Sequence, residues 1–258
     1  MKKQLYKTMV ELTQNPIYTK MIKTFTKSKV SGRLNHSFSK VYQINHGEME
    51  REIHEYATLN DFFVRKLKPG SRPIASDCVV SPVDGKLSQV GTITEDATFH
   101  IKEKDYKLGT MLGLESSTQR YLGGTFMLFY LSPKDYHRIH SPLTGRLVKR
   151  WALGKYSEPV NQMGLLLGKE PLANNYRLIT ELEHKDRRMA MVKIGALNVN
   201  SVHPTHHKKE VEVGEELAYF SFGSSVILLF EKGMIEPSVD TSTVDLPVMQ
   251  GQEIAKWL

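Results

Sequence analysis

Four residues have side chains and neighbours that suit acid–base or nucleophilic chemistry: Asp84, His137, His140 and Ser224. Asp84 lies in SPVDGKL, where Asp-Gly after Pro is typical of a turn between strands. The two histidines share the segment LSPKDYHRIHSPLTG; they would lie on one side of a helical turn but on opposite faces of a strand. Such a pair can bind a metal or act as separate acid and base, and a purely structural pair is the competing interpretation.

Ser224 lies in YFSFGSSVILLF, a strand-like run interrupted by Gly223, Ser224 and Ser225. A glycine there is typical of a bulge or a bend. Asp84, one histidine and Ser224 have the residue types of an Asp-His-Ser triad, although geometry defines a triad. The G-x-S-x-G elbow of serine hydrolases is absent. A serine directly after a glycine in an apolar strand suits attack on the protein's own backbone better than an open hydrolase site.

Three further histidines lie in HPTHH, at His203, His206 and His207. No set of carboxylates or thiolates at a regular metal-site spacing accompanies them, so we expect a solvated loop and no metal. The chain also lacks a phosphate-binding glycine loop and a nucleotide fingerprint. The single cysteine, Cys78, cannot form an intramolecular disulfide, which favours a reducing compartment, and we expect it to be a small core residue.

The elements that must position these residues begin with a helical N-terminus. Apolar residues recur at helical spacing in three stretches before residue 43, and Ser31 is the expected cap of the third. The segment TLNDFFVRKLKPG predicts a further helix that begins at Thr58 and ends at Pro69-Gly70.

Beyond this helix the pattern changes to short strands separated by turns. The clearest strand-like segments are 78–91, 125–133, 188–199 and 216–230. No linker or repeat divides them. The sequence therefore predicts an α+β fold, with short amphipathic helices over residues 1–57 and a predominantly antiparallel β-rich domain over residues 58–258.

The positive charge is concentrated at the N-terminus. Residues 1–43 contain nine Lys or Arg and one acid, Glu11, whereas the remainder is close to neutral. Basic helices with apolar faces suit an anionic membrane surface, where each Lys or Arg contributes roughly 1 kcal/mol. A helical lid packed on the body is the alternative.

Basic and aromatic residues are not interleaved for base stacking, so we expect no nucleic acid partner. No run is long enough for a membrane-spanning helix, and no signal peptide is expected.

Four blocks in order resemble the phosphatidylserine decarboxylase proenzymes of the prokaryotic type. They are LNDFFVRKLKPGSRPI at 59–74, SPVDG at 81–85, YHRIHSP at 136–142 and FGSS at 222–225. The segment VGEELAYFSFGSSVILLFEKG also resembles the C-terminal block of that family, and the similarity covers roughly residues 55–235. The chain departs from the family at Phe222, where leucine is commoner, and in NVNSV at 198–202, where the family more often has Val-Gly-Ser-Ile.

The resemblance implies a self-processing enzyme in which Asp84, His140 and Ser224 form the maturation triad. His140 would accept the Ser224 proton while Asp84 orients the imidazole. Ser224 would attack the Gly223 carbonyl to give an ester, whose elimination and hydrolysis leave a pyruvoyl group and ammonia. The resemblance further implies that this covalent cofactor forms a Schiff base with the amine of phosphatidylserine, and that His137 donates the proton that completes phosphatidylethanolamine.

The resemblance also implies how the molecule is assembled and located. The chain would be cut between residues 223 and 224, and its two pieces would remain together as a heterodimer, with a further homo-oligomer left open. We expect peripheral binding to the cytoplasmic face of the membrane through residues 1–43. An uncleaved serine hydrolase and a non-catalytic membrane-docking module are the competing interpretations.

Overall fold

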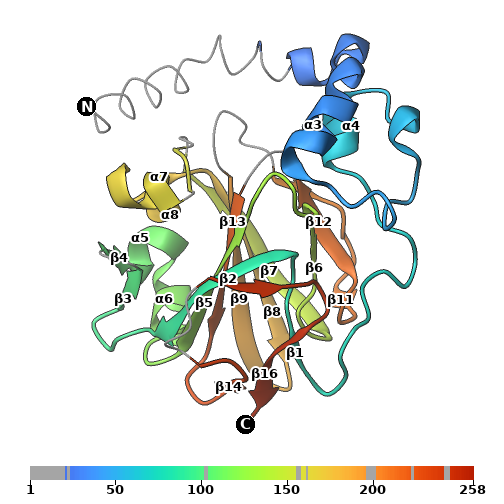
Figure 1. Cartoon of the computed structure of the whole chain (residues 1–258). Helices are drawn as coiled ribbons and strands as arrows, with labels where there is room; N and C mark the ends of the chain where they lie inside the picture. Colours follow the sequence, from blue (N-terminus) through green and yellow to red (C-terminus); the bar gives the residue numbers. More distant parts are fainter. Residues whose placement is uncertain are drawn as a thin grey trace.

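An eight-stranded antiparallel sheet forms the centre of the molecule (Figure 1). The computed structural model describes residues 21, 24–101, 104–154, 158–160, 162–195, 202–221, 224–240 and 245–258. The strand order is β11-β7-β8-β9-β13-β5-β2-β15. In chain order these strands are β2 (Gly85–Thr92), β5 (Thr125–Leu131), β7 (Gly145–Leu153), β8 (Arg177–His184), β9 (Arg187–Gly195), β11 (Glu210–Val211), β13 (Ser224–Phe230) and β15 (Leu246–Val248).

Three smaller sheets and several short helices complete the body. The first contains β1 (Cys78–Val80), β16 (Glu253–Trp257) and β14 (Ile235–Pro237), and the second contains β10 (Val202–Pro204), β12 (Glu216–Phe220) and β6 (Arg138–His140). The third is the hairpin of β3 (Thr98–Ile101) and β4 (Lys104–Lys107). The helices of the body are α5 (Leu108–Leu112), α6 (Glu115–Arg120), α7 (Gln162–Leu167) and α8 (Pro171–Asn174).

Each face of the large sheet buries its own hydrophobic core. One core packs the sheet against the two three-stranded sheets, with Ile139, Phe220 and Ile254 among its members. The other packs it against the β3–β4 hairpin and the helices of the body, with Phe99, Leu112 and Leu172 among its members. The helices and the β3–β4 hairpin therefore cover one face, and the two three-stranded sheets cover the other.

Strand β13 lies between these cores and supplies side chains to both. Val226, Leu228 and Phe230 belong to the first core, whereas Ile227 and Leu229 belong to the second, and all are fully buried. A strand covered on both faces reads as a continuous apolar run, which is why VILLF shows no alternation. Antiparallel ladders to β5 and β9 run along its whole length.

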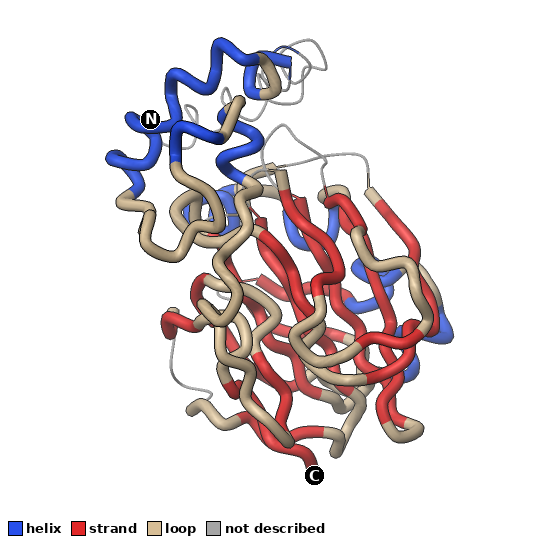
Figure 2. Tube along the Cα trace, turned by 90° about the vertical axis from the view of Figure 1, so that its right-hand side faces the viewer, coloured by secondary structure: helices blue, strands red, loops and turns tan. Residues whose placement is uncertain are grey.

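The N-terminal segment forms a third, smaller cluster at one end of the strands (Figure 2). Its helices are η1 (Lys29–Leu34), α3 (Asn35–Tyr42), η2 (Ile53–Glu55) and α4 (Leu59–Phe63). The cluster joins residues on both sides of position 57, because Leu59 and Phe62 pack with Ile44 and Met49. The expected helical stretches before residue 21 lie outside the described residues.

Two local predictions for this segment need correction. Thr58 does cap α4, since its hydroxyl accepts a hydrogen bond from the Asp61 amide, but the helix ends at Phe63 and not at Pro69-Gly70. Ser31 is no helix cap; it lies inside η1, where its hydroxyl accepts from the Leu59 amide and donates to main-chain carbonyls. A long-range contact with α4 therefore determines the role of Ser31.

The predictions for the β body are largely confirmed. The α+β class and antiparallel pairing hold, and Cys78 is a buried core residue. The segment 216–230 is two strands, β12 and β13, which belong to different sheets. Residues 196–199, predicted to extend β9, lie outside the described residues. Within the described chain no helix is long and apolar enough to cross a bilayer.

Candidate active site

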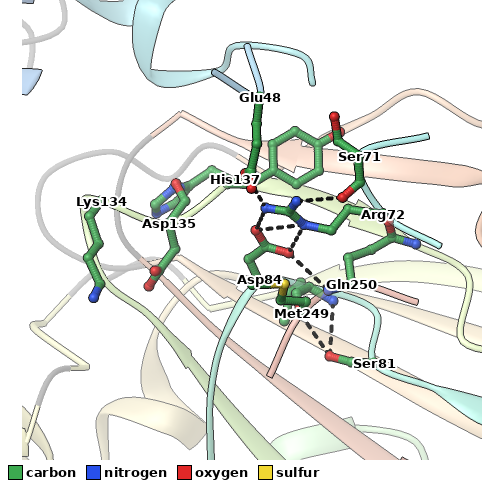
Figure 3. A network of polar contacts seen from close by, with 12 residues as sticks. Glu48, Ser71, Arg72, Ser81, Asp84, Lys134, Asp135, His137, Met249 and Gln250 are labelled. Carbon is green, nitrogen blue, oxygen red and sulfur yellow. Dashed lines mark hydrogen bonds and ion pairs between the residues drawn. The ribbon is translucent and has the colours of Figure 1, made fainter. Parts of the chain in front are cut away.

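Asp84 occupies the predicted turn between β1 and β2, where Arg72 holds its carboxylate (Figure 3). Arg72 Nε lies 2.9 Å from Oδ1 and Arg72 Nη2 lies 2.5 Å from Oδ2. The Gln250 amide donates to Oδ1 at 2.9 Å, and Glu48 accepts from Arg72 Nη2 at 2.9 Å. The hydrogen bond to Asp84 raises the pKa of Arg72 above its usual value, so this cation stays charged. The Arg72 guanidinium and the Gln250 amide therefore both hold the Asp84 carboxylate in place.

The residue after Asp84 must be glycine for this turn to sit against the large sheet. Gly85 has φ 153° and begins β2. A Cβ atom there would lie 2.4 Å from the Tyr130 carbonyl oxygen, a distance that no side chain can adopt without backbone movement. The close approach brings Asp84 to the end of β5.

His140 ends the short strand β6 and presents a basic nitrogen. Its Nδ1 lies 2.8 Å from the Gly214 carbonyl oxygen, which can only accept, so Nδ1 carries the proton. Nε2 is then the acceptor for the Tyr136 hydroxyl at 3.1 Å. Burial lowers the pKa of His140, an effect that the Gly214 carbonyl partly offsets. At neutral pH the imidazole is therefore uncharged and can accept a proton at Nε2.

Asp84 and His140 are neighbours through the backbone. The His140 amide donates to the Pro82 carbonyl at 2.9 Å, in the same turn as Asp84. The carboxylate acts on His140 through its charge, but the two side chains are not hydrogen-bonded to each other in the described structure. The Gly214 carbonyl, and not Asp84, is the group that orients the ring.

His137 is fully buried directly before β6. Its Nδ1 donates to the Asp135 carbonyl at 2.8 Å, and its ring lies 4.2 Å from the Phe63 ring. Nε2 has no hydrogen-bond partner among the described residues. Burial lowers the pKa of His137 to about 3, and the nearby Arg65 adds to this effect. His137 is therefore a neutral imidazole with an available lone pair.

The backbone of Ser224 opens β13, in register with Leu131 of β5 and Gly195 of β9. The predicted cleavage partner Gly223 lies outside the described residues. The strand before it, β12, reaches the histidines, since the Phe220 amide donates to the His137 carbonyl at 2.9 Å. Ser224 therefore follows only a few residues after Phe220, the residue whose backbone contacts His137.

The sequence did not indicate three groups that hold these residues: Arg72, Tyr136 and Gly214. Arg72 belongs to KPGSRPI and Tyr136 to DYHRIH, so each lies within a block that was singled out, but no local pattern shows which residue it contacts. Gly214 contributes a carbonyl oxygen, which any residue has. Only the fold brings these partners to Asp84 and His140.

The HPTHH segment is partly strand and partly buried, contrary to the prediction of a solvated loop. His203 lies in β10 with its ring stacked on Tyr219, at 4.8 Å between centroids. His206 is 4% exposed, and its Nδ1 lies 3.2 Å from Glu215 Oε1. His207 alone of the three is exposed. The described residues contain no group of three ligands that could hold a metal ion.

Comparison with known proteins gives consistent matches over this whole region. Residues 59–256 match the family model for phosphatidylserine decarboxylase. A phosphatidylserine decarboxylase proenzyme of Geobacillus kaustophilus is 46% identical over 259 residues, covering 100% of this chain and 98% of the relative. A Bacillus cereus protein of the same name is 50% identical over 238 residues, covering 92% of this chain and 91% of the relative.

Acid should destabilise the fold through His137. With a folded pKa of about 3 and an unfolded pKa near 6.5, only the unfolded chain binds this proton at pH 5. The stabilisation is complete above pH 6.5 and falls by about 1.4 kcal/mol per pH unit as the pH drops toward 3. In a Ser224→Ala background, used to keep one intact chain, His137→Gln should reduce the loss between pH 7 and pH 5 by about 2 kcal/mol.

Urea unfolding at the two pH values measures this difference. The control is His36→Gln, an exposed position on α3, which should show the pH dependence of the parent. An unchanged pH dependence in His137→Gln would contradict the burial of a neutral imidazole.

Proposed function

The chain belongs to the phosphatidylserine decarboxylase family, and from that premise we propose that it converts phosphatidylserine to phosphatidylethanolamine with a pyruvoyl group made from its own Ser224. Three features support this proposal: Arg72 holds the Asp84 carboxylate, both histidines are neutral, and Ser224 opens β13 within the region that matches the family. These lie in the catalytic domain that we assign to residues 58–258.

The residues around position 224 fit such a group. The pyruvoyl group would be residue 224 itself, joined to Ser225, and its backbone position is held between Leu131 and Gly195. The buried His137 Nε2 has no partner among the described residues, so one unsatisfied polar atom remains for reaction chemistry. Because the group would be part of the chain, no separate loop is required to bind it as a cofactor.

Self-cleavage begins with His140 as the base. Its Nε2 accepts the hydroxyl proton of Ser224, while the Gly214 carbonyl holds the ring through Nδ1. The Tyr136 hydroxyl occupies the same lone pair and must turn away first. The Ser224 oxygen attacks the Gly223 carbonyl and replaces the peptide bond by an ester. Loss of the Ser224 α-proton expels the Gly223 carboxylate, and hydrolysis of the dehydroalanine releases ammonia.

His137 is placed to move the proton of the decarboxylation step. The pyruvoyl carbonyl supplies an electrophile for the substrate amine and an electron sink as CO₂ leaves. A neutral imidazole cannot donate from Nε2 at the outset, so His137 first accepts the proton of the substrate ammonium group there. It then returns that proton to the substrate α-carbon, and the product amine regains a proton from solvent.

The two pieces should stay together after cleavage. Strand β13 pairs with β5 on one side and β9 on the other, and its side chains are buried in both cores. Strand β16 likewise pairs with β1, which belongs to the large piece. These ladders link the two pieces without a disulfide.

We assign membrane contact to the N-terminal surface, defined by its described apolar and basic residues. The apolar residues Phe25, Val30, Leu34 and Val41 are 40–74% exposed, and Lys27, Lys29, Arg33 and Lys40 surround them. An apolar stripe among cations suits an anionic lipid surface and the substrate's own charge. Peripheral attachment at the cytoplasmic face would bring the lipid to the adjoining site.

Purified protein should separate into two chains on a denaturing gel. Intact mass should place the cut between Gly223 and Ser224, with a blocked N-terminus on the smaller chain. Ser224→Ala should leave one chain, and His140→Gln should slow or abolish cleavage because it removes the base. Ser225→Ala is the matched control and should still be cut. A single intact chain in active wild-type protein would refute the pyruvoyl mechanism and favour a hydrolase.

The same preparations should distinguish the role of His137 in decarboxylation from that of His140 in self-cleavage. His137→Gln should be cut normally but decarboxylate short-chain phosphatidylserine at least about a hundredfold more slowly, the usual size of a lost acid–base group. Equal loss of both activities would contradict the division of roles.

Membrane contact can be tested by sedimentation with phosphatidylglycerol vesicles. Combining Val30→Ser with Val41→Ser should weaken binding about tenfold, because both side chains would leave the lipid for water. Leu166→Ser, an equally exposed apolar position on α7, is the control and should bind as the wild type does. Unchanged binding of the double variant would favour the helical lid.

A further inference from the structure

A cavity of about 380 Å³ opens between Asp84 and the loop that follows β5. Its size is in the usual range for small-molecule sites. The residues that line it include Asp84, Lys86, Tyr130, Lys134, Asp135 and Met249. Figure 3 shows Lys134 and Asp135 on one side of the site and Asp84 with Met249 on the other.

Strand β5 links the cavity to the reacting position. Tyr130 and Ser132 line the cavity, and between them Leu131 pairs with Ser224. Tyr130 itself pairs with Ser225. The end of β5 therefore lies between the cavity and the first residues of β13.

The acidic groups of the cavity are already neutralised or hydrogen-bonded. Asp84 is paired with Arg72 at 2.5 Å. The Asp135 carboxylate accepts from the amide and hydroxyl of Ser132, at 2.7 and 2.8 Å. Neither carboxylate is left to attract a ligand's cation.

The two lysines of the cavity, in contrast, carry uncompensated charge. Lys86 is the second residue of β2, paired with Tyr130 of β5 and Pro247 of β15, and Lys134 lies in the loop after β5; both side chains are exposed. Neither ammonium group has a hydrogen bond or an ion pair within the described residues. The main chain at Lys134 is held in place, because Arg65 Nη2 donates to the carbonyls of Lys134 and Asp135 at 2.8 and 3.2 Å.

Strand β15 adds an apolar part to the lining. It consists of Pro247, which pairs with Lys86, together with Val248 and Met249, and Met249 is 56% exposed. A cavity lined by two cations and an apolar strand matches an amphiphile with an anionic head.

We propose that Lys86 and Lys134 bind the phosphodiester of the lipid headgroup; this inference rests on the proposed function. Lysine ammonium groups are common phosphate ligands, and their exposed position leaves the phosphate partly in water. In a serine headgroup only two carbons separate the phosphate ester oxygen from the amine. A phosphate bound by these lysines at the end of β5 would therefore direct the amine toward residue 224 and leave the carboxylate for the buried region near His137.

Binding of the soluble product headgroup, glycerophosphoethanolamine, tests this subsite without requiring catalysis. Calorimetry with the full-length protein should show about threefold weaker binding for Lys86→Ala or Lys134→Ala and about tenfold weaker binding for both together. Replacing both by arginine should retain affinity within about twofold. Lys107→Ala, an exposed lysine on β4, is the control and should bind as the wild type does.

Kinetics provides the second readout. With short-chain phosphatidylserine below its aggregation concentration, the double variant should raise KM about tenfold with little change in kcat, and self-cleavage should be normal. Inorganic phosphate should compete more weakly than glycerophosphoethanolamine, and ethanolamine should not compete. Equal competition by inorganic phosphate would overturn the headgroup assignment in favour of a general anion site.

Two other results would overturn the subsite: unchanged affinity in the double variant, or an equal loss in Lys107→Ala. Failure of the proposed function is distinguishable from these. An uncleaved, inactive wild type would refute the pyruvoyl mechanism, whereas the calorimetric comparison would still decide whether the lysines bind the headgroup.

Discussion

The bidentate pair between Arg72 and Asp84 is the constraint on which the site depends. It joins the chain leaving the N-terminal helices to the β1–β2 turn, and the Gln250 amide ties the C-terminal segment to the same carboxylate. The two side chains are 9% and 11% exposed, so removing one would leave a poorly solvated charge, at a cost of about 3–5 kcal/mol. The turn that they secure also holds the backbone of His140 through Pro82.

The architecture also keeps both histidines neutral, His137 fully buried and His140 half-buried, and each ring is hydrogen-bonded to a carbonyl through Nδ1. This leaves one basic nitrogen on each ring, but in different settings. Nε2 of His140 meets a tyrosine hydroxyl, whereas Nε2 of His137 lies in an apolar enclosure against Phe63. Phe63 of the N-terminal helices forms part of that enclosure, so the segment to which we assign membrane contact also shapes the site.

Features encoded by local pattern were predictable from the sequence. The Thr58 cap, the Asp84 turn and the buried apolar run of β13 each depend on neighbouring residues. Arg72, Gly214 and the burial of His206 were not predictable, because their partners are distant in sequence and only the packing of sheets brings them together. The family resemblance proposes which residues react and gives Asp84 the role of orienting the His140 ring, whereas in the structure the Gly214 carbonyl holds that ring.

We propose that Asp84 supports self-cleavage through its pair with Arg72 and not through a direct hydrogen bond to His140. The most direct measurement is the self-cleavage rate, followed by denaturing gel after cell-free synthesis, for wild type, Arg72→Lys, Asp84→Asn and the double variant. The account predicts that both single variants are slower and that the double variant is little slower than either, because one interaction is lost in every case. A wild-type rate in Arg72→Lys with a slow Asp84→Asn, or fully additive effects, would contradict it.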